Sequence, residues 1–75
     1  MTIEQVRKLH QARPFTPFDI HLADGRSIPV PHPEFLAQSA SGRTIGVAVE
    51  DDAIEVIDLL LVTSLKPRSK RPRSR

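Results

Sequence analysis

Six of the eleven basic residues lie in the last ten positions, where no acidic residue separates them. These six are the predicted nucleic-acid contacts: Lys66, Arg68, Lys70, Arg71, Arg73 and Arg75. Such a charge density attracts a polyanion. The segment has no aromatic residue to stack on bases, so RNA or DNA binding through it is expected to be independent of sequence. The composition leaves two alternatives open: a solubilising or family-variable extension without a ligand, and a membrane-surface or targeting role.

Three histidines and one acidic run are the candidate metal ligands. His21 is expected on the outer face of a strand, and Pro33 separates His32 from Glu34, so their spacing does not bring them to one point. His10 lies in a predicted helix. The acidic run 50–52 lacks the glycine and the ligand spacing of a calcium loop and is expected to be a solvated turn. The sequence predicts no metal site and no cofactor.

Catalytic residues are not indicated either. The chain has no cysteine, no G-x-S-x-G motif and no glycine-rich phosphate loop. Asp58 lies in an apolar run with no second acid or base close to it in sequence, so we expect it to cap a bend by accepting from backbone N–H groups. A fold of about 65 residues leaves little room for a deep pocket. We therefore predict that the protein is not an enzyme, and we infer no small-molecule substrate.

The N-terminal residues predict a helix over 2–12. Thr2 and Gln5 have the spacing of a capping box, and Pro14 disfavours helix at the residue before it. A helix of about ten residues is unstable alone in water, so its apolar side must pack on the rest of the chain. That side is formed by Ile3, Val6 and Leu9.

Residues 18–30 predict a β-hairpin with alternating apolar side chains. A three-residue loop with Gly25 in the left-handed conformation opposes Ile20 to Ile28, which keeps the apolar residues on one face. Pro29 and Pro31 remove N–H groups from one side of the second strand. This strand is therefore expected at an edge or a bend of the sheet.

The remaining strands are predicted between residues 34 and 65. Residues 34–38 fit either a further strand or a short helical turn. Alternation places Ile54 and Val56 on the buried row of their strand. The run 57–65 is apolar on both faces, as expected for a strand and a brief bend, with the helix over one face and a second protomer over the other.

Size and charge limit the remaining possibilities. The sequence predicts one domain, 1–65, with the helix at 2–12 and the sheet at 18–65, followed by a basic disordered tail, 66–75. The body is mildly acidic, with five basic and nine acidic residues and a net charge of −4. A chain this short buries only about 60% of its unfolded surface, and without cysteine the remaining route to extra stability is oligomerisation. No segment fits a membrane span or a secretory signal, so the expected location is cytoplasmic.

The order of these elements resembles that of small Sm-like and SH3-like barrels. The matching features are the N-terminal helix, a strand ending in LADGR, a bent second strand, a turn at SASGR and a final apolar pair around VIDLLLVTSL. The resemblance implies a mostly β (α+β) fold, in which the helix precedes a curved antiparallel sheet of four or five strands. Sm-like proteins assemble into rings through edge strands and bind RNA.

The string PFTPFDIHLADGRSIPVPHPEF is also similar to a set of short, uncharacterised bacterial proteins that share PF-x-PF-x-I-x-L-x-DGR and V-x-HPEF. This resemblance covers most of residues 2–65 and implies a small domain without an assigned activity. The leading hypothesis is therefore a non-enzymatic interaction module that self-associates through an edge strand. The alternative is a nucleic-acid-binding protein that uses the tail.

Overall fold

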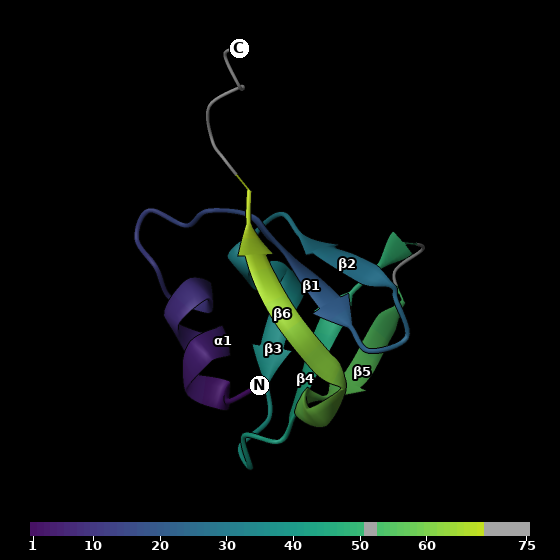
Figure 1. Cartoon of the computed structure of the whole chain (residues 1–75). Helices are drawn as coiled ribbons and strands as arrows, with labels where there is room; N and C mark the ends of the chain where they lie inside the picture. Colours follow the sequence, from purple (N-terminus) through teal and green to yellow (C-terminus); the bar gives the residue numbers. More distant parts are fainter. Residues whose placement is uncertain (51–52, 69–75) are drawn as a thin grey trace.

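The computed structural model describes residues 1–50 and 53–68 and shows, in this part of the chain, one N-terminal helix followed by six strands (Figure 1). The elements are α1 (Ile3–His10), β1 (Phe18–Leu22), β2 (Ser27–Val30), η1 (Pro33–Phe35), β3 (Leu36–Gln38), β4 (Thr44–Ala48), β5 (Ile54–Asp58), η3 (Leu59–Leu61) and β6 (Val62–Pro67). The strands form two antiparallel sheets, ordered β2–β1–β6 and β3–β4–β5. The predicted mostly β class is confirmed, but the single sheet of four or five strands is wrong. Within the described residues, no helix combines the length and hydrophobicity that a membrane crossing requires.

Helix α1 begins with the predicted capping box. Gln5 N–H donates to the Thr2 hydroxyl at 3.4 Å, and the Gln5 side-chain oxygen accepts from Thr2 N–H at 3.0 Å. Both bonds satisfy N–H groups that have no partner within the helix. The helix ends at His10 rather than Ala12, and Gln11 caps it by donating to the Arg7 carbonyl. Val6 is fully buried, so the helix packs through its apolar side as expected.

The β1–β2 hairpin has the predicted register. Ile20 lies opposite Ile28 and Phe18 opposite Val30, with Gly25 at a φ of 94°. A positive φ is costly for residues with a Cβ, so glycine allows the tight loop that sets this register. Strand β2 ends at Val30, before Pro31.

Between the two sheets the chain makes a short turn and then a short strand. Residues 33–35 form the 3-10 turn η1, and residues 36–38 form β3. The strand and the helical turn that were alternatives for residues 34–38 are therefore both present. The turn interrupts the strand path after β2, and β3 pairs only with β4. This interruption separates the predicted single sheet into two.

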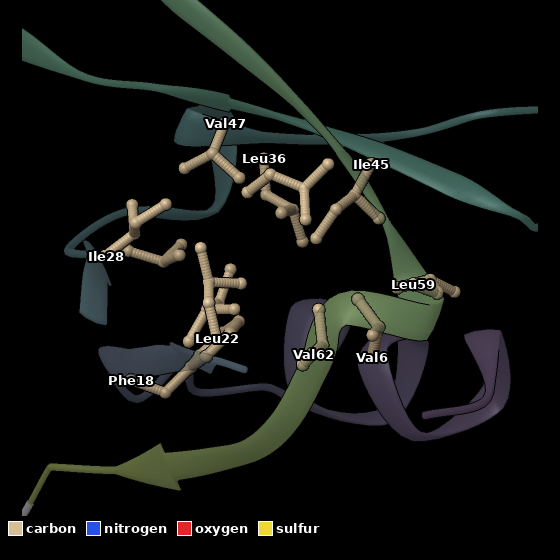
Figure 2. Packing of buried hydrophobic residues seen from close by; sticks show 12 residues of the cluster. Val6, Phe18, Leu22, Ile28, Leu36, Ile45, Val47, Leu59 and Val62 are labelled. Carbon is tan, nitrogen blue, oxygen red and sulfur yellow. The ribbon is translucent and has the colours of Figure 1, made fainter. Parts of the chain in front are cut away.

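The hydrophobic core lies between the two sheets, as Figure 2 shows. Phe18 and Ile20 contribute from one sheet, and Ile45 and Val47 from the other; all four are almost completely buried. The side chains in the core are Val6, Phe18, Ile20, Leu22, Ile28, Val30, Leu36, Ile45, Val47, Ile57, Leu59 and Val62.

Strand β5 has the opposite orientation to the one predicted. Ile57, which lies opposite Ile45, is the buried residue, whereas Ile54 and Val56 are 70% and 72% exposed. Directly opposed residues share a face, so the core position of Ile45 fixes Ile57 as the inner residue. The prediction that Val56 belongs to the buried row is therefore wrong.

The last strand continues past the expected end of the domain. Strand β6 runs to Pro67, two residues beyond Leu65, and pairs Lys66 with Asp19 of β1. At the start of the preceding turn the Asp58 carboxylate accepts from Leu60 N–H at 2.9 Å, which confirms the predicted cap.

Candidate functional site

Only two of the six predicted nucleic-acid contacts lie in the described residues. Arg68 donates two hydrogen bonds to the Asp19 carboxylate, at 2.8 and 3.3 Å, and this carboxylate raises the pKa of Arg68. Its charge is thus compensated within the fold. Lys66 belongs to β6, and Lys70, Arg71, Arg73 and Arg75 lie outside the described residues. Nucleic-acid binding through the tail stays a prediction, and a truncation that tests it must leave Arg68 in place.

The histidines do not come together. His10 bridges two elements: one ring nitrogen lies 2.8 Å from the Pro33 carbonyl oxygen and the other 2.8 Å from the Gln38 side-chain nitrogen. His32 packs against the ring of Phe35. Among the residues that the structure describes, no three histidine or acidic side chains form a metal-binding group. His10 is therefore a bridge that holds α1 beside η1 and β3.

An ionic chain links the β1–β2 turn to strand β5. The Arg26 guanidinium contacts Asp24 at 3.0 Å and Glu55 at 2.7 Å. Backbone and side-chain hydrogen bonds from Arg26 hold the pKa of Asp24 below its ordinary value, and the two carboxylates raise the pKa of Arg26. These ion pairs are solvent-exposed, so their effect on the stability of the fold is small. Their role is to hold the turn beside β5.

Arg26→Gln is expected to return the pKa of Asp24 toward its ordinary value of 3.8. A lowered carboxyl pKa stabilises the fold above the unfolded value, and this contribution is lost as the pH falls through the folded value. The substitution should therefore reduce the acid sensitivity of stability below about pH 4. Carboxyl NMR titration measures the shift directly. Arg43→Gln is the control, because Arg43 makes no ion pair with Asp24.

The sheet edges differ in their capacity to accept another strand, and β2 is blocked. Leu22 N–H donates to the Arg26 carbonyl, so the even-numbered residues of β2 face β1. By alternation, Ser27 and Pro29 direct their backbone groups to the open side. Pro29 has no N–H, and a neighbouring strand would miss a hydrogen bond there. The expected edge position of β2 is confirmed.

Two further edges are also protected. In β6, Arg68 N–H donates to the Pro17 carbonyl, so by alternation Leu65 and Pro67 face away from β1, and Pro67 has no N–H. Strand β3 has only three residues, and its Gln38 side chain is bound to His10 of helix α1. Short strands, prolines and covering helices are the usual protections of sheet edges.

Strand β5 lacks these protections. Val49 N–H donates to the Ala53 carbonyl and Leu59 N–H to the Arg43 carbonyl, so odd-numbered residues of β5 face β4. By alternation, Ile54, Val56 and Asp58 direct their N–H and C=O groups to the open side. Within residues 1–50 and 53–68, these groups have no backbone partner. Figure 1 shows helix α1 on the side of the molecule away from β5.

The same segment carries the large apolar side chains that the fold leaves in water. They are Ile54 (70% exposed), Val56 (72%), Leu60 (85%) and Leu61 (53%). We call this group, together with the open backbone groups of β5, the β5 edge. Sequence reasoning missed it because Ile54 and Val56 alternate as buried residues do.

No family model, no curated protein and no solved structure matches this chain.

Beside the β5 edge lies an open groove of about 480 Å³ between β2 and the end of β4. Its walls include Pro29, Phe35 and Val49, together with the charged residues Arg26, Glu50 and Glu55. Of these charged groups, Arg26 and Glu55 are paired with each other. In the described part of the chain no polar or charged side chain is buried. The groove thus presents a mainly apolar surface, on which two of the three charged groups neutralise each other.

Proposed function

We propose that this protein is a non-enzymatic interaction module that self-associates through the β5 edge. The asymmetry of the sheet edges carries this proposal. Proline blocks β2 and β6, and helix α1 lies against β3. In β5, by contrast, three N–H groups have no backbone partner among the described residues, and they lie beside exposed isoleucine and valine. A strand with these properties accepts another strand readily.

The energy of burial supports the same proposal. Fully burying a Val, Leu or Ile side chain contributes roughly 1.5–3 kcal/mol. Four such side chains remain exposed on β5 and η3, in a chain without cysteine and with a small core. Association through the β5 edge would recover part of this contribution. A chain of this size gains proportionally more from it than a large domain does.

We further propose that the two sheets form a small barrel of the SH3-like or Sm-like kind. The order of elements supports this: a hairpin, a 3-10 turn, a three-stranded meander, a second 3-10 turn and a last strand that returns to β1. In the Sm-like proteins edge strands also join the subunits. We also propose that the chain is related to the short bacterial proteins that share its DGR and HPEF motifs.

Light scattering over about 1 µM to 1 mM protein tests self-association, because this range covers the dissociation constants of weak interfaces. The chain has neither Trp nor Tyr, so concentration must be followed by refractive index. The mass is expected to rise from 8.4 kDa toward twice that value with concentration. A constant mass of 8.4 kDa over the whole range would refute the proposal.

A further inference from the structure

We propose that the partner at the β5 edge is a second copy of the chain whose β5 runs antiparallel, with a two-fold axis at Val56. This inference rests on the proposed function and specifies its geometry. It would join β3–β4–β5 of each protomer into one continuous sheet of six strands.

The backbone allows only a few alignments. The open N–H and C=O groups of β5 belong to even-numbered residues, so an even-numbered residue of one copy must bond an even-numbered residue of the other. An axis at Val56 pairs all five residues of β5, from Ile54 opposite Asp58 to Asp58 opposite Ile54. Any other axis within the strand pairs at most three of them.

Charge disfavours two of the other axes. An axis at Glu55 places the two Glu55 carboxylates directly opposite each other, and an axis at Asp58 does the same for Asp58. Like charges in directly opposed positions destabilise a strand pair. With the axis at Val56, each carboxylate lies opposite an isoleucine of the other copy, and Glu55 keeps its ion pair with Arg26.

The exposed side chains also favour this axis. Val56 would meet its own copy across the seam, and Ile54 would lie diagonal to the other Val56, within reach of contact. The neighbouring strand β4 presents Gly46 and Ala48 on the same face, and the Ile54 side chain already lies over Gly46. The result is a continuous apolar stripe on the outer face of the joined sheet.

Single-cysteine variants test the axis, because the chain has no cysteine of its own. Each of Ile54→Cys, Glu55→Cys, Val56→Cys and Asp58→Cys is oxidised as the full folded chain, and disulfide-linked dimer is measured on non-reducing gels. Paired residues at about 5.5 Å between Cα atoms are within disulfide range. Thr44→Cys, on β4 and away from the edge, gives the background rate.

Val56→Cys is expected to form linked dimer about tenfold faster than the other variants, since only this position meets itself within disulfide reach. A mixture of Ile54→Cys and Asp58→Cys should link faster than either alone. Fastest linking at Glu55 or Asp58, or no preference among the variants, overturns the axis if the unmodified chain still dimerises in light scattering. A chain that stays monomeric refutes both the axis and the proposed function.

Discussion

Val56→Pro is expected to leave the chain folded and to weaken self-association at least 30-fold, by about 2 kcal/mol. Val56 N–H points to the open side of β5, so the substitution removes no hydrogen bond within the protomer. With the two-fold axis at Val56, the two copies exchange two hydrogen bonds at this residue, and proline removes both. Each contributes about 0.5–1.5 kcal/mol, which gives the expected loss. Light scattering against concentration measures it.

Two comparisons separate lost pairing from lost folding. Val56→Lys keeps the N–H but places a charge on the seam, and it should also dissociate the dimer because edge lysines oppose strand pairing. Ser27→Lys puts the same side chain on the β2 edge, where Pro29 already prevents pairing, and should leave the mass unchanged. Amide NMR spectra report whether each variant is folded. A folded Val56→Pro variant that dimerises as well as the original chain would contradict the β5 edge.

The protein already has proline at two positions on its sheet edges. Pro29 and Pro67 both occupy positions whose missing N–H points away from strand β1. The first of these was recognisable from the sequence, because the hairpin register follows from local alternation. The second was not, because a run of Lys, Arg, Ser and Pro has the composition of a disordered segment. The long-range pairing of Lys66 with Asp19 and of Pro67 with Phe18 shows that β6 extends so far.

Local signals account for the elements that were predicted correctly. The capping box of α1, the left-handed Gly25 and the Asp58 cap each depend on residues within three positions of one another. Such features are encoded where they occur, so the sequence alone is enough to place them. The hairpin belongs to the same group, because a short loop fixes which residues oppose each other.

Long-range packing explains the elements that were predicted wrongly. The segment Ile54–Ile57 has apolar residues on both rows, so a period of two cannot tell which row is buried. Ile57 becomes the inner residue only through its pairing with Ile45. The division into two sheets likewise depends on η1, whose sequence fitted a strand as well as a turn. For this reason the β5 edge could not have been identified without the fold.

Phe18→Ala is expected to destabilise the domain by about 3–5 kcal/mol. Phe18 is fully buried and lies opposite both Val30 of β2 and Pro67 of β6. A chain of this length has a total stability of roughly 4–11 kcal/mol at ordinary values per residue. The substitution therefore leaves a large fraction of molecules unfolded. Because the chain has no Trp or Tyr, urea unfolding should be followed by circular dichroism at one protein concentration.

Phe35→Ala is the matched control, because it removes the same side chain from a half-buried position. Phe35 lies in η1, packs against the core from outside and contacts His32. Since its ring is already partly in water, its loss removes less buried area and leaves a smaller cavity, so the cost should be about half that of Phe18→Ala. The two phenylalanines thus test whether the core lies between the sheets. If Phe35→Ala costs as much as Phe18→Ala, then η1 contributes to the core as much as β1 does, and the packing described for the two sheets is wrong.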